Sequence, residues 1–291
     1  MVDVETRELR YFAAVARELH FGRAAESLGI AQPPLSRAIH QLEQRLGVKL
    51  FDRDRRGVAL TEAGAVLMRE AGPALDAVAA AARRAQRAGH PRKPLMLVTK
   101  AGASHELLRE LLDAVSVTPG APPVEVVLCE VGEQATFLRD GRADVGLMHR
   151  PVDDLSGFDT EELHVEGQVA IVPAQHPLAR HEHLTLAQIR DVPDLPLARW
   201  PRLDGTYPPG PGPEVRTQSQ TAQLVALNKA LLVIPESSRA WQWPQHKAVP
   251  VLDAPEVTTV IAWPALSHSR EIAAVVRVAT ELAALNTLAS A

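Results

Sequence analysis

Hydrogen-bonding side chains recur along one face of a predicted helix near the start of this chain. The apolar residues between positions 33 and 46 fall at offsets of 0, 4, 7 and 11, which is one stripe of an α-helix: Leu35, Ile39, Leu42 and Leu46. The opposite face carries short or flat polar groups, one strong cation and few carboxylates: Pro33, Ser36, Arg37, His40, Gln41 and Gln44. Arginine can bond twice to the edge of guanine, and glutamine can do the same with adenine. The face therefore predicts contact with DNA bases, the alternative being an ordinary solvated helix face.

The flanking segments predict a compact unit around this helix. Apolar spacing indicates a helix over residues 8–18 and a shorter one over 23–28, which Gly29 ends. Pro33 and Pro34 suit the first turn of the third helix, because N–H groups there lack intrahelical partners. Residues 50–51 and 58–60 then predict two strands around a polar turn. This wing carries three cations, Arg53, Arg55 and Arg56, which would neutralise backbone phosphates. Asp52 and Asp54 offset part of that charge or pair with the arginines.

This order of residues resembles the signature of LysR-type transcriptional regulators. The matching segments are LRYF at 9–12, AAESL at 24–28, AQPPLSRAI at 31–39, LE at 42–43 and LGVKLFDR at 46–53. The resemblance implies a winged helix-turn-helix domain over residues 1–60 in which α-helical residues touch bases and Arg53 touches phosphate. The predicted DNA-binding residues are Gln32, Pro33, Pro34, Ser36, Arg37, His40, Gln41, Arg53, Arg55 and Arg56.

Residues 61–89 predict a long linker helix, followed by a hinge over 90–94. Thr61 is the expected N-cap, and Glu62 in the first turn favours the helix dipole, whereas Gly64 weakens the start slightly. Small and apolar residues then recur at spacings of three and four: Gly64, Leu67, Ala71, Ala74, Val78, Ala81, Ala85 and Ala88. This is the seam of a two-helix coiled coil, although the helix propensity of alanine alone would give the same pattern. Pro73 falls inside this stretch and could bend the helix. The family resembled dimerises through this helix, so we expect a homodimer or homotetramer on paired half-sites.

From residue 95 onward, apolar runs alternate with helical patterns, which is typical of a parallel α/β sheet. Two such series predict two lobes, one over about 95–164 plus 254–291 and one over about 165–253. ADVGL at 143–147 and HPLA at 176–179 resemble landmarks of the LysR effector domain. The resemblance implies an α/β multidomain protein whose effector domain, residues 95–291, is two-lobed and similar to type 2 periplasmic binding proteins. Residues 225–235 lack the glycines usual there, which puts the local turn in doubt, and residues 208–213 predict a stiff, extended loop.

A ligand of parallel α/β lobes lies beyond the carboxyl ends of the strands. The predicted effector-binding residues are Lys100, Gly102, Ser104, His149, Arg150, Arg199, Trp200, Ser219 and Gln220. Helix N-termini and three cations in one crevice would favour a small carboxylate. The alternative is that these residues are ordinary surface or hinge groups.

Charge supports different partners for the two parts of the chain. Residues 1–93 carry 16 Lys and Arg against 11 Asp and Glu, a balance of +5, whereas the remainder carries 15 against 24, a balance of −9. A positive first third suits a polyanion, and an acidic remainder does not. No apolar run approaches a membrane span and the first residues are acidic, so we expect a cytoplasmic protein without a membrane partner. A lone cysteine, Cys129, excludes an internal disulfide.

Catalytic motifs are weak, so the sequence predicts no enzyme, cofactor or metal site. His181 and His183 flank Glu182 without a third ligand at metal-site spacing, and Ser104 lacks the Gly-x-Ser-x-Gly pattern. The prediction is a sequence-specific transcriptional regulator of the LysR type that binds double-stranded DNA and a small effector, with RNA polymerase as a candidate further partner. Two alternatives stay open. One is a solute-binding or enzymatic protein of the same α/β fold, and the other is a regulator controlled by abundance or by a protein partner.

Overall fold

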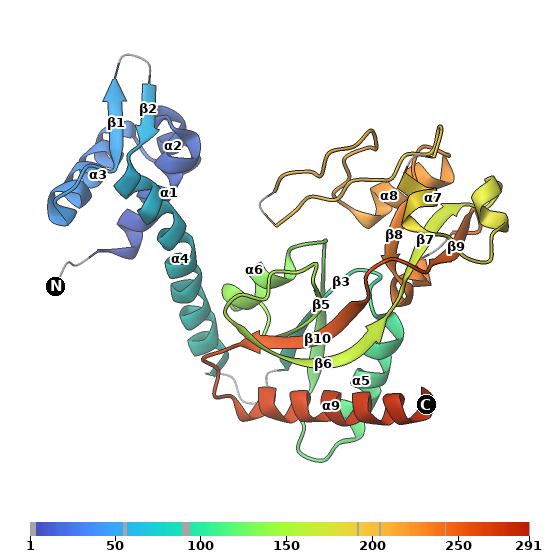
Figure 1. The fold of residues 1–291 in the computed structure, drawn as a ribbon. Coiled ribbons are helices and arrows are strands. Elements are labelled where there is room, and N and C mark those ends of the chain that lie inside the picture. Colours follow the sequence, from blue (N-terminus) through green and yellow to red (C-terminus); the bar gives the residue numbers. More distant parts are fainter. Residues whose placement is uncertain are drawn as a thin grey trace. The chain divides into compact units, whose positions relative to one another are not determined.

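The computed structural model describes residues 4–54, 57–88, 94–190, 192–203, 205–241 and 243–290 (Figure 1). The chain divides into two compact units, the first built on residues 1–89 and the second on residues 90–138 and 142–291. Each unit has hydrophobic clusters of its own and is considered by itself.

The N-terminal unit is a helix-turn-helix with a two-stranded wing. Its elements are α1 (Thr6–Glu18), α2 (Phe21–Ser27), α3 (Gln32–Leu46), β1 (Phe51–Asp54), β2 (Gly57–Leu60) and α4 (Glu62–Ala88). Phe51 packs 5.3 Å from Phe12 and 5.9 Å from Phe21, ring centre to ring centre, and so ties the wing to the helices. The second helix begins at Phe21 and not at Arg23 as predicted, because Nδ1 of His20 accepts the N–H of Arg23 at 3.1 Å and caps it.

The linker helix begins where the sequence indicates. Thr61 Oγ1 accepts the N–H of Gly64 at 3.0 Å, which confirms Thr61 as N-cap, and the helix continues through Pro73. Gly64 does more than weaken the start. A Cβ at this position would lie 2.1 Å from the carbonyl oxygen of Leu50, so only glycine lets the helix approach the wing this closely.

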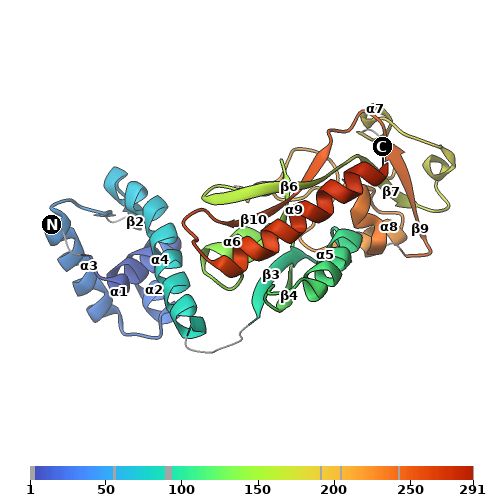
Figure 2. The same cartoon turned by 90° about the horizontal axis from the view of Figure 1, so that it is seen from below.

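The C-terminal unit contains a five-stranded sheet in the order β4-β3-β5-β10-β6. Its strands are β3 (Leu95–Lys100), β4 (Val124–Cys129), β5 (Val145–Arg150), β6 (Phe158–Glu166) and β10 (Val257–Pro264). β3 pairs in parallel with β4 and β5, whereas β10 runs antiparallel to β5 and β6. Helices α5 (His105–Val117) and α9 (Arg270–Ser290) pack together on one face (Figure 2), and α6 (Gln134–Arg139) contributes to a second apolar cluster. The chain returns to this sheet through β10 and α9, as predicted.

A smaller three-stranded sheet forms the second lobe, in the order β8-β7-β9. Its elements are β7 (Gln168–Pro173), α7 (Leu186–Arg190), α8 (Gln218–Ala226), β8 (Leu232–Pro235) and β9 (His246–Val251), with 3-10 turns at Pro177–Arg180 and Glu236–Trp241. Both neighbours of β7 run antiparallel to it, so the prediction of parallel strands is right for β3, β4 and β5 and wrong for this lobe. Residues 196–199 and 214–217 of this lobe form only isolated bridges, Leu197 with Leu231 and Arg199 with Glu214.

The glycine-poor turn after α8 is made by an asparagine. Asn228 adopts φ 57°, a left-handed conformation that asparagine tolerates better than most residues. Its N–H bonds to the carbonyl of Val225 at 3.0 Å, and the N–H of Lys229 bonds to that of Leu224 at 2.9 Å. The turn therefore closes without the glycines that are usual in the family resembled.

Candidate DNA-binding surface and effector site

The predicted base-reading residues belong to α3, which Figure 1 shows beside the wing strands β1 and β2. Leu35, Ile39 and Leu42 are fully buried and fix which side of the helix points outward. Ser36 is half-buried, and the other predicted residues of this helix are exposed: Gln32, Pro33, Pro34, Arg37, His40 and Gln41. The periodicity argument is thus confirmed as to the exposed face, whereas the base contacts stay a prediction.

The first turn of α3 has few free backbone N–H groups that could contact DNA. Its N-cap, Ala31, makes no side-chain cap, and the turn contains no acidic residue that would repel phosphate. Pro33 and Pro34 have no N–H, so two of the donors usually left free at a helix start are absent. This turn therefore presents the positive end of the helix and the side chain of Gln32, and Arg37 lies in the next turn.

Arg53 lies beside the recognition helix and not in the wing turn where the sequence suggests it. It belongs to β1, opposite Val58, and its Nη1 donates to Ser36 Oγ at 3.4 Å. Its guanidinium carbon lies 4.1 Å from the centre of the Phe21 ring, a cation–π distance. An exposed cation is thereby held next to the base-reading face. Arg55 and Arg56 lie outside the described residues.

Glu43 is a buried carboxylate to which the sequence analysis gave no role. Its Oε1 accepts the backbone N–H groups of Leu50 at 2.9 Å and Phe51 at 3.3 Å, and its Oε2 lies 3.3 Å from Lys49 Nζ. Burial alone would raise the pKa of Glu43, but these hydrogen bonds and the Lys49 charge lower it on balance. The carboxylate therefore fastens the start of the wing to α3. The sequence feature that could have pointed to this role is the position of the glutamate directly after Leu42, a residue of the apolar stripe.

The predicted coiled-coil seam of α4 is partly buried in the N-terminal unit and partly exposed. Ala71 is buried in the core of the N-terminal unit, whereas Ala74, Val78, Ala81 and Ala85 are exposed in the single chain. An exposed row of small and apolar side chains on a long helix is the surface that a second helix covers in a coiled coil.

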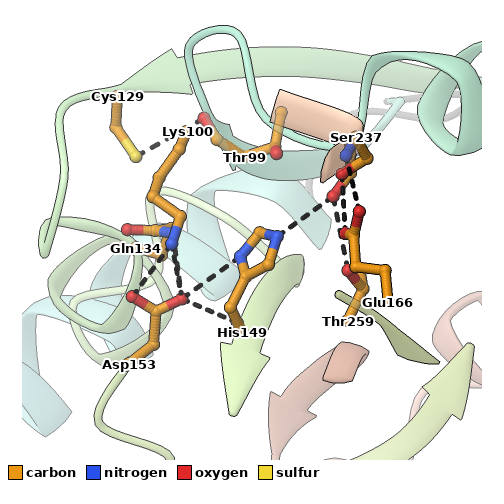
Figure 3. Close-up of polar contacts among 10 residues, drawn as sticks. Thr99, Lys100, Cys129, Gln134, His149, Asp153, Glu166, Ser237 and Thr259 are labelled. Atoms are coloured by element: carbon orange, nitrogen blue, oxygen red, sulfur yellow. Dashed lines mark hydrogen bonds and ion pairs between the residues drawn. The ribbon is translucent and has the colours of Figure 1, made fainter. Parts of the chain in front are cut away.

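Five of the predicted effector residues lie at or just beyond the carboxyl ends of β3 and β5, and three of them, Lys100, Ser104 and His149, belong to one polar cluster (Figure 3). Lys100 Nζ lies 3.1 and 3.3 Å from the two carboxylate oxygens of Asp153, and both side chains are almost fully buried. Asp153 also accepts the backbone N–H of His149 at 2.7 Å and Nε2 of Gln134 at 3.4 Å. Lys100 and His149 could be named from the sequence, whereas Asp153, which lies 53 residues from Lys100 in the chain, could not.

Ser104 and His149 form the other half of this cluster. Ser104 Oγ lies 3.1 Å from His149 Nε2 and 3.5 Å from Thr259 Oγ1. Burial lowers the pKa of His149, although Asp153 opposes the shift, so the imidazole is neutral. Three buried side-chain atoms find no hydrogen-bond partner among the residues that the structure describes: Thr99 Oγ1, Gln134 Oε1 and His149 Nδ1.

The other predicted effector residues are engaged elsewhere. Arg150 reaches across the sheet to Glu162 at 2.7 Å and to Thr160. Arg199 donates to the carbonyls of Pro208 and Gly212 and pairs with Glu214, so it braces the proline-rich loop. Trp200 packs against the apolar cluster of the second lobe, and Gly102, with φ 75°, turns the chain after β3.

Ser219 and Gln220 are exposed in the first turn of α8, and Gln220 Oε1 accepts the N–H of Arg216 at 3.1 Å. Lys100, Arg150 and Arg199, the three cations expected in one crevice, each have a carboxylate partner within the C-terminal unit. A cavity of about 950 Å³ lies elsewhere in the C-terminal unit, between α5, β6 and α9, and no predicted effector residue lines it.

The cluster is not a nucleophilic triad, despite its serine, histidine and aspartate. Ser104 follows a strand with φ 48°, but it is fully buried. His149 Nδ1 lies 3.6 Å from Asp153, beyond hydrogen-bonding distance, and Lys100 holds that carboxylate. Burial, with the nearby Glu133, raises the pKa of the Cys129 thiol to about 12.

No group of three or more metal-ligating side chains occurs among the described residues. Nor does any helix in the described ranges combine the length and apolarity needed to cross a bilayer.

Comparison with known proteins gives consistent matches along the chain. A family model described as "Bacterial regulatory helix-turn-helix protein, lysR family" matches residues 6–65, and one described as "LysR substrate binding domain" matches residues 88–284. The HTH-type transcriptional regulator AlsR of Bacillus subtilis is 35% identical over 210 residues, 69% of this chain and 67% of AlsR.

Two further matches extend over nearly the whole length. The HTH-type transcriptional regulator IlvR of Caulobacter vibrioides is 31% identical over a match that covers 96% of this chain and 98% of IlvR. The crystal structure of CbnR, described as a LysR family transcriptional regulator, matches with a TM-score of 0.62 at 23% identity, over 96% of this chain and 99% of CbnR, which shows the shared fold.

Proposed function

The chain belongs to the LysR family of DNA-binding transcriptional regulators, and from this premise we propose that it reads its operator through the outer face of α3. One observation carries the proposal: the fully buried stripe of Leu35, Ile39 and Leu42 leaves the hydrogen-bonding face toward solvent. In this proposal Gln32, Arg37 and Gln41 contact base edges, with Pro33, Pro34, Ser36 and His40 beside them.

Phosphate contacts fix the register of the reading head in this proposal. Arg53, held by Ser36 and Phe21, meets the backbone next to the bases that α3 contacts, and Arg55 and Arg56 meet it further along the wing. Residues 1–60 are the DNA-binding domain, and residues 61–89 join two copies through the exposed part of the α4 seam. Such a dimer, or a tetramer of two dimers, presents paired reading heads to operator DNA and positions them for contact with RNA polymerase.

Regulation is proposed to come from a small effector in the domain of residues 95–291, which follows the hinge at 90–94. The predicted site narrows to the carboxyl ends of β3 and β5. Lys100 and His149 lie in the last two positions of these strands, and Gly102 and Ser104 follow β3. Two features support this location: the polar cluster of Figure 3, and its three buried atoms without partners. Arg150, Arg199, Trp200, Ser219 and Gln220 are left out of the proposal, because their contacts lie within the sheet and the second lobe.

Binding to DNA from upstream of the protein's own gene and its neighbours tests the proposal. We expect fluorescence anisotropy to show tighter binding to one such duplex than to random duplex, with salt dependence in both cases. Arg37→Ala should weaken specific binding by about 1 to 3 kcal/mol and relax the sequence preference. Arg17→Ala removes the same charge from an exposed position on α1 and serves as the control. If Arg37→Ala weakened binding to every sequence equally, its base-reading role would be refuted.

A further inference from the structure

The charges around Lys100 decide which effectors the proposed site can accept. Lys100 and Asp153 are 9% and 3% exposed, and the Lys100 ammonium lies against both carboxylate oxygens. A buried ammonium without a partner would be a strong site for an anion. With Asp153 in place, the pair carries no net charge.

Asp153 is positioned by more than its attraction to Lys100. The backbone N–H of His149 and the Gln134 amide both donate to its Oδ2. A carboxylate approaching Lys100 would meet a carboxylate that is already fixed there, and like charges at this distance repel strongly away from water. Glu166 adds further negative charge, since its oxygens accept the N–H and Oγ of Ser237 at 2.5 and 2.7 Å and not a cation.

The remaining groups of the cluster are neutral hydrogen-bonding groups. Ser104, Thr259 and His149 offer two hydroxyls and a neutral imidazole. Thr99 Oγ1, Gln134 Oε1 and His149 Nδ1 have no partner, although their side chains are at most 1% exposed. Buried polar atoms without a partner are rare in native proteins, and each indicates a hydrogen-bonding group that the protein itself does not supply.

We propose that Asp153 is a specificity-determining residue: by cancelling the charge of Lys100 it makes the effector site select an uncharged hydrogen-bonding ligand, such as an amide or an alcohol, and reject small carboxylates. The proposal rests on the effector site proposed above. It replaces the small anion that the sequence alone favours, because the cation that would have bound the anion is already paired.

Thermal unfolding of the full chain with matched probes tests this charge masking. The probes are acetate against acetamide and benzoate against benzamide. The chains are the wild type, Asp153→Asn, Lys100→Met, and the double variant Lys100→Met/Asp153→Asn. We expect Asp153→Asn to lower the Tm and to regain it as acetate or benzoate is added, with a rise that grows with the logarithm of concentration. The wild type and the double variant should show only the shift that added salt causes in both.

Two results would overturn the proposal. One is a carboxylate-induced rise in the Tm of the wild type that Lys100→Met abolishes, because Lys100 would then be available to anions. The other is an Asp153→Asn variant that responds to carboxylates no more than the double variant does. If Asp153→Asn does not fold, Asp153→Ala leaves room for acetate, and recovery of its folding with acetate but not acetamide is the equivalent result.

The same probes separate this proposal from the effector site itself. Thermal unfolding reports whether Asp153 masks Lys100. Whether the cluster controls DNA binding is reported by the response of operator affinity in Asp153→Asn to acetate, measured by anisotropy. Masking without any effect on operator binding would leave the specificity argument intact and refute the location of the effector site.

Discussion

Replacing Glu43 tests whether the recognition helix and the wing are held as one unit. The carboxylate is 4% exposed and accepts the N–H groups of Leu50 and Phe51, while Lys49 pairs with it from a side chain that is 66% exposed. Glu43→Ala would leave two buried backbone donors unpaired, at a cost of about 1 to 3 kcal/mol each. The exposed pair with Lys49 adds less than about 1 kcal/mol. Together these give a loss of about 2 to 7 kcal/mol from the N-terminal unit.

Glu43→Gln separates charge from shape. The amide oxygen keeps the acceptor but loses the charge that strengthens both hydrogen bonds, so we expect a smaller loss of about 1 to 2 kcal/mol. The two units can be followed separately in the full chain, because all four tryptophans lie in the C-terminal unit, at positions 200, 241, 243 and 263. Urea unfolding by far-UV circular dichroism should show an early loss of helix, while the tryptophan transition stays in place.

An exposed glutamate of the same unit provides the control for these variants. Glu70→Gln removes an equal charge from the surface of α4 and should change stability by less than about 0.5 kcal/mol. If Glu43→Ala destabilised the N-terminal unit no more than Glu70→Gln does, the wing would be held by its apolar contacts alone. The reasoning from the buried carboxylate would then be refuted.

Three further predictions follow from single contacts. Gly64→Ala should destabilise the N-terminal unit by about 1 to 3 kcal/mol, because its Cβ would meet the Leu50 carbonyl. Gly72→Ala, which has open space around it, should instead stabilise α4 by up to about 1 kcal/mol, and urea unfolding followed by circular dichroism measures both. Arg53→Ala should lower DNA affinity by a similar factor on all sequences and make the logarithmic salt slope shallower by about one, and a loss confined to the operator would contradict its phosphate role. Burial lowers the pKa of His149, so the unfolded chain binds a proton at this residue more readily than the folded one. The C-terminal unit should therefore lose stability as pH falls below about 6.5. His149→Gln should make this dependence of stability on pH weaker, and an unchanged dependence would assign it to His176 and His246.

Periodic elements of the fold could be predicted from the sequence, because an amphipathic helix reports its buried face in every turn. The stripe of α3 and the cap of α4 are of this kind. β6 and β9 could not be found in this way. β6 is an edge strand with polar and charged residues at most of its positions, so it lacks an apolar run, and β9 contains Pro250. The antiparallel order of the second lobe depends on which strands pair, and local pattern does not encode that.

The candidate sites divide in the same way between local and distant determinants. The exposed face of α3 follows from spacing within one helix, so its residues could be named in advance. Glu43 holds Leu50 and Phe51 beyond the turn at Gly47, and Asp153 meets Lys100 across 53 residues. Such partners are brought together by tertiary packing. Asp153 lies in no motif, and the match at 42–43 does not by itself give Glu43 a role.

The distribution of charge supports the different functions proposed for cations in the two parts of the chain. Beyond residue 93 there are 24 acidic residues for 15 basic ones, and Lys100, Arg150 and Arg199 each pair with a carboxylate. In residues 1–93 basic residues outnumber acidic ones, and no carboxylate among the described residues pairs with Arg37. A cation that meets no carboxylate within its own fold keeps its charge for a phosphate or a base edge, whereas one that does becomes part of the framework. A cation such as Arg37 is therefore the one proposed to contact DNA, whereas Lys100 is neutralised by Asp153.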